Sequence, residues 1–266
     1  MKNISNFHTH TQLCHHAIGM PQDYAKQAEI EGCSALGFSD HCPYPDTPTD
    51  NWSSVRMTIP QIELYKTEIQ KVKESVSFPV FWGFECEYDR TFLSWYRDEL
   101  LGHFGAQYLV LGSHWLTKGN SRIYCPELTD PKDISAYIDQ TIEGMQTGLF
   151  AFLAHPDLFM KGYKEWDAQS KAWLKALLDA AIDLNLPIEI NGLGMSREPI
   201  QTTHGLRYQY PYREFWETVA QTSVPVICNS DAHDPQDVIF NAQKARNFAA
   251  RLGIEPIDFP EFTQLP

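Results

Sequence analysis

The sequence has little that would place the chain in a membrane or on a nucleic acid. No stretch approaches the ~20 consecutive apolar residues of a membrane-spanning helix, and the N-terminal residues lead into polar His8-Thr9-His10 without the apolar core of a secretory signal. The 21 lysines and arginines are outnumbered by 34 aspartates and glutamates, which gives a formal net charge of −13. Binding along a phosphate backbone draws on clustered basic residues. We therefore expect a soluble, cytoplasmic protein that binds a small molecule and no nucleic acid.

Closely spaced cysteine pairs are also missing. The six cysteines lie far apart and form no C-x-x-C pair: Cys14, Cys33, Cys42, Cys86, Cys125 and Cys228. Zinc fingers and thiol redox motifs need such pairs. We expect free, reduced thiols. Internal repeats and low-complexity segments are absent as well.

Seven short apolar runs rich in β-forming residues alternate with longer helical patterns. They lie at 4–8, 34–39, 80–85, 108–113, 150–155, 187–191 and 224–229. Alternation of strands and helices is typical of a parallel sheet. At this length of 266 residues an α/β barrel is ordinarily one domain. The sequence therefore predicts a single domain over 1–266, an α/β protein with a distorted (β/α)7 TIM-like barrel.

Apolar spacing and turn residues locate several of the helices. One apolar face has residues three and four apart, namely Ile62, Tyr65, Ile69, Val72 and Val76. An earlier helix opens at Pro21, carries Tyr24 and Ala28 on its buried side, and ends where Gly32 can take a left-handed conformation. A later one shows the stripe Trp173, Leu177, Ala181 and Leu184, and Asn185 and Pro187 end it.

Polar side chains that can bind metal follow six of the seven runs. They are His8 and His10, Asp40 and His41, Glu85, His114, His155, and Asp231 and His233. Active sites on α/β barrels lie at the carboxyl ends of the strands. Residues i and i+2 of an extended chain point the same way, so His8 and His10 can grip one ion, as can Asp231 and His233 if extended. Eight of the ten histidines lie in or beside these strand ends, and we infer a metal site.

The stretches around these residues resemble a known family. They are His8-Thr9-His10-Thr11-Gln12-Leu13-Cys14-His15-His16-Ala17, Ser39-Asp40-His41, Gly83-Phe84-Glu85, Gly112-Ser113-His114, Ala154-His155-Pro156-Asp157 and Ser230-Asp231-Ala232-His233. H-x-H or D-x-H alone occurs by chance in many chains, but the full set is diagnostic. Over nearly its whole length the chain resembles the polymerase and histidinol phosphatase (PHP) family, and more closely its histidinol-phosphate phosphatase branch.

The resemblance implies a trinuclear centre in which Glu85 bridges two ions. His8, His10, Glu85 and Asp231 would hold the first ion; Glu85, His114 and His155 the second; and His16, His41 and His233 the third. The family pattern H-x-H-T-x-x-C-x-H ends on His16, so we expect the adjacent His15 to be exposed or to support a ligand. Cys14 and Cys86 are expected to pack beside ligands. Imidazole and carboxylate suit zinc, iron and manganese alike, and the identity of the metal stays open.

The implied reaction is hydrolysis of L-histidinol phosphate to L-histidinol and inorganic phosphate, a step of histidine biosynthesis. A hydroxide bridging the ions is the expected nucleophile, because metal binding lowers the pKa of water to ~7. Asp231 and His233 are candidates to protonate the leaving alkoxide, and a water on a third ion is the alternative. Asp40 is expected to assist catalysis by orienting a histidine rather than by binding metal.

Substrate contacts are predicted from the residues near the strand ends. Arg197 on a glycine-rich loop, Lys161 and His204 are the candidates to bind phosphate. Glu189, Tyr210 and Trp115 are candidates for a wall against the amine and imidazole of the substrate. Each has a simpler alternative: Lys161 can be a solvated surface residue, the two aromatic residues can cover the barrel edge, and Glu189 can pair with Arg197.

Three other functions compete with the first. A PHP-type nuclease or phosphodiesterase would keep the metal site, but the acidic charge argues against it. A phosphatase acting on another small phosphomonoester stays open. A non-catalytic scaffold would be expected to lack ligands, whereas every expected ligand occurs here.

Overall fold

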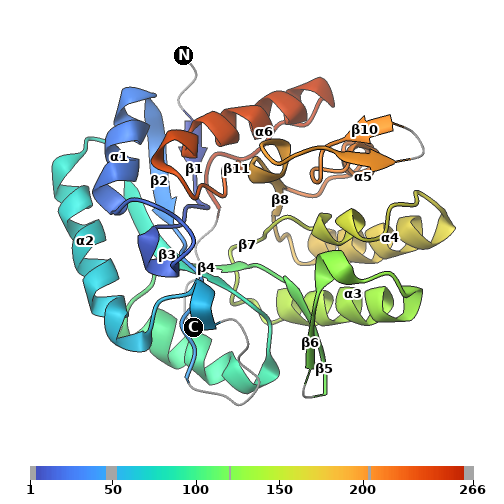
Figure 1. The fold of residues 1–266 in the computed structure, drawn as a ribbon, viewed down its shortest axis with the longest axis horizontal. Helices are drawn as coiled ribbons and strands as arrows, with labels where there is room; N and C mark the ends of the chain where they lie inside the picture. The colour runs from blue at the N-terminus through green and yellow to red at the C-terminus, as the bar shows by residue number, and fades with distance from the viewer. Residues whose placement is uncertain (1–3, 46–52, 120, 203–204, 261–266) are drawn as a thin grey trace.

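A seven-stranded parallel sheet forms the centre of the molecule. The computed structural model describes residues 4–45, 53–119, 121–202 and 205–260. Along the sheet the strands follow the order of the chain: β1 (Ile4–Asn6), β2 (Cys33–Phe38), β3 (Val80–Cys86), β4 (Tyr108–Leu111), β7 (Phe152–Leu153), β8 (Ile188–Asn191) and β11 (Val226–Asn229). The predicted parallel strands are confirmed, and the sheet curls into a distorted, TIM-like arrangement (Figure 1). Where β1 and β11 approach each other, Thr9 and Ala232 form an isolated parallel bridge.

Helices cover the outside of the sheet. They are α1 (Pro21–Ile30), α2 (Ile62–Ser75), the π-helix Trp95–His103, α3 (Pro131–Gln146), α4 (Ala168–Asp183), α5 (Arg213–Val219) and α6 (Phe240–Arg251). In Figure 1, α1 and α2 lie on one side of the sheet, α3 and α4 on the opposite side, and α6 runs across the top beside β1 and β11. No helix among the described residues combines the length and the apolar character needed to cross a bilayer.

The predicted helix faces are confirmed with one exception. Four residues of α2 in the predicted stripe are fully buried, and Gly32 after α1 has φ +75°. Leu184, however, follows the last residue of α4 and is 41% exposed. The helix ends at Asp183, one residue before the apolar stripe does, and Asn185 then turns the chain with φ 50°. Leu184 therefore points away from the core.

Most of the central strands end before the apolar runs that predicted them. β1 stops at Asn6 instead of residue 8, and β7 covers two residues of the predicted 150–155. Near three of these ends a non-glycine residue has a positive φ, namely Ser113 (49°), His155 (29°) and Asp231 (52°). The chain thus leaves the sheet at the residues predicted to bind metal. Asp231 and His233 accordingly do not form the extended pair that the sequence allowed.

Two hairpins were not predicted. β5 (Trp115–Lys118) pairs with β6 (Ser121–Tyr124), and β9 (Ile200–Thr202) pairs with β10 (Gly205–Arg207). Each hairpin follows a central strand at the carboxyl edge of the sheet. Tyr124 of the first hairpin lines the cavity at the candidate metal centre, whereas the second hairpin lines a different cavity, and both are described below.

Apolar side chains fill the interior below that edge. One cluster consists of Phe7, Ala35, Tyr108, Val110, Ala151, Phe152, Ala154 and Ile227. We call this cluster the floor. The free, buried cysteines agree with the expectation of reduced thiols.

Candidate metal centre

The carboxylate of Glu85 is the hub of the candidate site. Glu85 lies near the end of β3 and is 3% exposed. Its Oε2 atom lies 3.4 Å from His8 Nε2, 3.4 Å from His10 Nε2 and 3.2 Å from His41 Nδ1. Its Oε1 atom lies 3.1 Å from His155 Nε2 and 3.6 Å from His114 Nε2. One carboxylate therefore faces five imidazoles from four segments of the chain.

The first predicted ligand set has the dimensions of a metal site. Asp231 Oδ1 lies 3.5 Å from His8 Nε2 and 3.2 Å from His10 Nε2. Ligand bonds of 2.0–2.1 Å in a tetrahedral zinc site place neighbouring donors about 3.3 Å apart. Both Nε2 atoms are buried and have no hydrogen-bond partner among the described residues. Buried polar atoms are normally satisfied, so these bare nitrogens fit a divalent cation.

The other predicted sets also come together. His41, Glu85 and His114 form one group whose donor atoms lie within 4.8 Å of one another, and His16, His41 and His233 form another. His41 belongs to both groups, whereas the family pattern implied a place only in the third set. His15 is exposed with φ 65°, and the ring of His16 reaches His233 with 2.9 Å between their Nε2 atoms. The choice of His16 over His15 therefore agrees with the geometry.

Burial and neighbouring charges shift the pKa values of the candidate ligands in different directions. Burial opposes ionisation of Glu85 and Asp231, but neighbouring imidazoles hold the pKa of each carboxyl well below its usual range. Burial lowers the pKa of His41 and of His16, and it lowers that of His233 to about 3. These three rings are neutral at pH 7, as ligands must be. In these states Asp231 is a carboxylate and His233 a neutral imidazole, so neither is in its acidic form before a metal binds.

Two other histidines behave in the opposite way. Burial opposes protonation of His8, but Asp231, Glu189 and Glu85 raise its pKa well above the usual value. Burial likewise opposes protonation of His114, while Glu85 and Glu87 raise its pKa to about 9. Because a metal ligand must be deprotonated, a cation entering these sets displaces protons.

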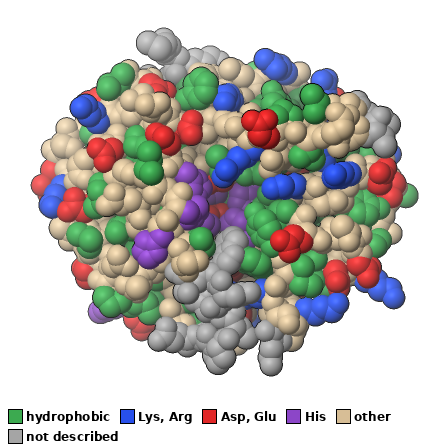
Figure 2. All heavy atoms as spheres, viewed as in Figure 1, with side chains coloured by type: hydrophobic (Ala, Val, Ile, Leu, Met, Phe, Trp, Pro, Cys, Tyr) green, Lys and Arg blue, Asp and Glu red, His purple; other side chains and the backbone are tan. Residues whose placement is uncertain are grey.

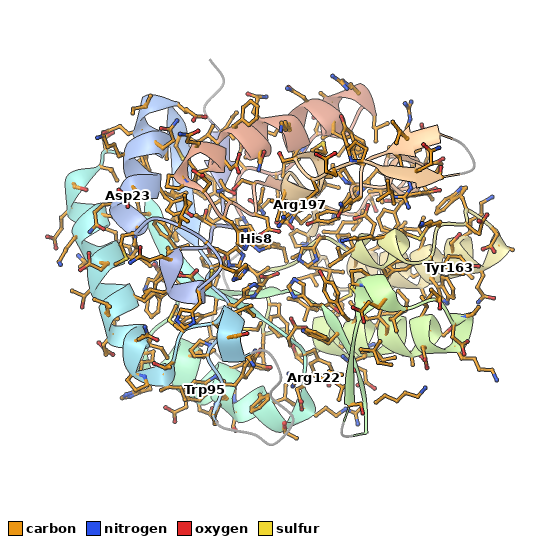
Figure 3. All side chains as sticks on the ribbon, in the orientation of Figure 1. His8, Asp23, Trp95, Arg122, Tyr163 and Arg197 are labelled. Carbon is orange, nitrogen blue, oxygen red and sulfur yellow. The ribbon has the colours of Figure 1, made fainter. Side chains whose placement is uncertain are left out.

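A cavity of about 230 Å³ opens onto these groups. Figure 2 shows histidines gathered in a central hollow of this face, and the labels of His8 and Arg197 both lie near the middle of the same view in Figure 3. Arg197 and Tyr210, two of the predicted substrate contacts, line the cavity. The glycine-rich loop permits this, because a Cβ on Gly194 would lie 2.2 Å from the Tyr210 carbonyl oxygen. A larger cavity of about 560 Å³ lies between β10, α5 and the end of α6, away from the candidate ligands.

The chain also matches the model of a known protein family. The family model for the PHP domain matches residues 6–192, more than half of the chain. The chain belongs to the PHP family. The predicted family and its TIM-like fold are thereby confirmed.

Several PHP relatives are similar over nearly the whole chain. A "Probable histidinol-phosphatase" of Deinococcus radiodurans is 28% identical, with 97% of each chain covered. The histidinol-phosphatase of Bacillus subtilis is 25% identical, with 87% of this chain and 94% of the relative covered. A crystal structure of histidinol phosphate phosphatase from Lactococcus lactis, complexed with zinc, L-histidinol and phosphate, superposes with a TM-score of 0.69 at 13% identity, over 98% of this chain and 99% of the other.

Two of the remaining predicted contacts, Trp115 and Lys161, are not among the described residues that line the cavity. Trp115 packs its ring 5.3 Å from Tyr124, and it is Tyr124 that lines the cavity. Lys161 is the last residue of a short 3-10 helix, Leu158–Lys161. Among the described residues of this helix, Leu158 lines the cavity and Lys161 does not. His204 lies outside the described residues. These two placements correct the predictions for Trp115 and Lys161.

Glu189 also differs from its predicted role. It is fully buried, and its carboxylate accepts hydrogen bonds from His8 Nδ1 (2.9 Å) and from the backbone N–H of His155 (3.1 Å). Asn191 and Asn229 donate two more. A carboxylate enclosed in this way can form neither a substrate wall nor the alternative pair with Arg197.

Asp40 does orient neighbouring groups, but not through a histidine nitrogen. Its carboxylate accepts hydrogen bonds of 2.6 Å from both the backbone N–H and the hydroxyl of Thr11, and it lies 3.9 Å from His10 Nδ1. Burial raises the pKa of Asp40 to about 6. The carboxylate therefore fixes the loop between His10 and Cys14. Cys14 is buried there, and its thiol donates to the Thr11 carbonyl.

Sequence reasoning missed Glu87 and the two asparagines. Glu87 accepts from the His114 ring Nδ1 (2.6 Å) and from the His114 backbone N–H (2.8 Å). Glu87 lies two residues after Glu85, and Asn191 two residues after Glu189. Because side chains i and i+2 share a face of a strand, this spacing could have found both. Tyr124 had no such signal, since its place depends on an unpredicted hairpin.

Proposed function

We propose that this PHP chain is a histidinol-phosphate phosphatase, a phosphoric monoester hydrolase that forms L-histidinol and inorganic phosphate, and that residues 1–266 act as one domain. The observation that carries the proposal is the Glu85 carboxylate, which faces five imidazoles at 3.1–3.6 Å. In the part of the chain that the structure describes, the buried His8 and His10 Nε2 atoms have no hydrogen-bond partner. The names of the two full-length relatives support the substrate.

The residues would hold three divalent ions. His8, His10 and Asp231 would bind the first together with Glu85. His114 and His155 would bind the second, again with Glu85. His16, His41 and His233 would bind the third. Such ions, when bound, neutralise phosphoryl oxygens and lower the pKa of a bound water. The zinc in the Lactococcus lactis structure supports zinc as one suitable metal.

The other cavity residues would bind and orient the substrate. Arg197 is exposed at the rim and can donate two parallel hydrogen bonds to a phosphate. Tyr124 and Tyr210 offer ring faces to the imidazole and amine of histidinol. Leu158 and Leu193 close the apolar remainder of the wall and exclude water there. The proposed ligands and the aromatic residues share this cavity, and the ring of Tyr210 lies 6.1 Å from that of His155.

Steady-state turnover after reconstitution with zinc, iron or manganese separately tests the proposal. The substrate panel contains histidinol phosphate, other phosphomonoesters, a dinucleotide and a cyclic diester. We expect the highest kcat/KM for histidinol phosphate. Preference for a diester would contradict the proposal and favour a nuclease or phosphodiesterase.

Two adjacent histidines provide a matched control. His16→Ala removes a proposed ligand, whereas His15→Ala changes the same residue type one position away on an exposed turn. We expect the first to lose zinc and turnover and the second to keep both. Equal effects of the two variants would contradict the proposed third site.

A further inference from the structure

The sixth central strand is the one strand end without a predicted metal ligand. β8 lies between β7, which precedes His155, and β11, which precedes Asp231. In place of a ligand, β8 presents Glu189 and, two residues later, Asn191 toward the same interior. Both side chains are buried, at 0% and 1% exposure.

The two oxygens of Glu189 accept hydrogen bonds from residues at the ends of different strands. Oε1 accepts from His8 Nδ1, at the end of β1, and from the Asn229 side chain, on β11. Oε2 accepts from the backbone N–H of His155, beyond β7, and from Asn191. The amide of Asn191 also donates to Asp231 Oδ2, 3.1 Å away. One carboxylate thus connects residues from the first and second proposed ion sites.

We propose that Glu189 is a positioning residue that prepares two ion sites at once, an inference that rests on the proposed metal centre. A carboxylate at His8 Nδ1 holds the proton on that nitrogen, so the lone pair of Nε2 faces Glu85 and Asp231. At the same time Glu189 holds the His155 backbone at φ 29°, where its ring Nε2 reaches Glu85. Loss of Glu189 therefore weakens both sites.

Glu87 offers the natural comparison. It also accepts two hydrogen bonds from a proposed ligand, but both come from the same residue, His114. His114 belongs to the second site. Glu87→Gln should weaken one ion, and Glu189→Gln should weaken two.

Both oxygens of Glu189 accept from N–H groups of His155, Asn191 or Asn229, so the amide nitrogen of a glutamine there faces at least one donor in either orientation. The substitution keeps the shape of the side chain and removes its charge. Partners that orient metal-bound histidines typically change metal affinity by about 10–100-fold when mutated. We expect a loss of that size at two of the three zinc sites.

The experiment is competition of zinc-loaded protein with a chelator, with the zinc-to-protein ratio measured at each chelator concentration. Wild type, Glu189→Gln and Glu87→Gln are compared. Glu189→Asp is added, because it keeps the charge but withdraws both oxygens. We expect two weakened sites in both Glu189 variants and one in Glu87→Gln. Zinc affinities in Glu189→Gln within threefold of wild type at every site would overturn the inference.

Two further readouts separate positioning from general structural support. Ring nitrogen NMR of His8 should report Nδ1–H in the wild type and lose that signature in Glu189→Gln. The unfolding temperature of the metal-free protein is measured separately, because the buried amide costs some stability of its own. A lower unfolding temperature with unchanged zinc affinity would overturn the inference, as would a wild-type chain that takes up no zinc. Zinc uptake without hydrolysis of histidinol phosphate would contradict the proposed function and leave Glu189 as a positioning residue.

Discussion

The floor and the metal centre are built from the same strands, yet they treat polar atoms in opposite ways. Phe7, Phe152 and Ile227 on the floor are fully buried, and the Tyr108 hydroxyl among them donates to the carbonyl oxygens of Phe7 and Phe38. One residue beyond Phe7, the His8 ring nitrogen Nε2 is just as buried and has no hydrogen-bond partner in the described part of the chain. The floor is complete as the chain folds, whereas the centre has donors that no protein group satisfies.

This difference teaches where stability and function reside. Burial of apolar side chains drives folding, and the floor supplies it directly beneath the strand ends. The rigid support then allows the next residues to hold carboxylates and imidazoles together despite their desolvation. We therefore expect substitutions on the floor to cost stability and substitutions in the centre to cost metal binding and turnover.

Glu85→Gln should give the largest effect. It keeps the shape of the side chain but removes the charge that two proposed ions share. Loss of one preorganised electrostatic group typically costs 10²–10³-fold in kcat, so we expect a loss of at least about 10³-fold for a group serving two ions. Turnover of histidinol phosphate and bound zinc per chain are measured together. Near wild-type values of both would break the distinction between the centre and the floor.

Ile227→Ala tests the floor. The substitution leaves a cavity under the centre and should lower the free energy of unfolding by about 2–5 kcal/mol. Denaturant unfolding measures it. Zinc per chain at low temperature should stay at the wild-type value, because no proposed ligand is removed. Loss of zinc without a lower free energy of unfolding would contradict the assignment of stability to the floor and of metal binding to the centre.

Asp157 lies two residues from His155 of the metal centre, yet its carboxylate has hydrogen-bond partners within the protein. One of its carboxylate oxygens, Oδ2, accepts from both the Tyr212 backbone N–H and Trp216 Nε1. Burial raises the pKa of Asp157 to about 6. The folded state thus favours the neutral form, and stability from this group is full below pH ~4 and is lost as the pH rises through about 6.

Asp157→Asn should remove that dependence, because an amide oxygen can accept both bonds without a charge. Between pH 4 and pH 7 the wild type should lose up to about 3 kcal/mol of unfolding free energy relative to the variant. Unfolding of both proteins at several pH values measures the difference. A wild type that gains unfolding free energy relative to Asp157→Asn as the pH rises from 4 to 7 would contradict the sign.

Arg197→Ala should give the smallest effect. The side chain lies at the rim of the cavity and touches neither the floor nor the proposed ligands in any hydrogen bond among the described residues. Loss of a charge-assisted phosphate contact should lower kcat/KM by about 10–100-fold, as expected for 1.5–3 kcal/mol. Zinc content and unfolding temperature should not change. An unaltered kcat/KM would assign phosphate binding to other residues.

The sequence predicted the elements and the convergence of ligands better than the details between them. Periodicity located the strands, and the family motifs selected His16 over His15. The role of Glu189 could not be predicted, because a glutamate at a strand end faces substrate or protein depending on how the neighbouring strands end. Trp115 was predicted to contact the substrate, but its hairpin partner Tyr124 lines the cavity instead. The hairpin that orients both residues has no strong pattern in the sequence. Leu184 was misplaced because a helix can end one residue before its apolar stripe.

Anomalous diffraction from crystals grown with zinc tests the central claim most directly. We expect zinc peaks within bonding distance of Glu85, with one bound also by His8, His10 and Asp231 and another by His114 and His155. A third peak should lie among His16, His41 and His233. Zinc found only at other positions, or no peak beside Glu85, would contradict the account.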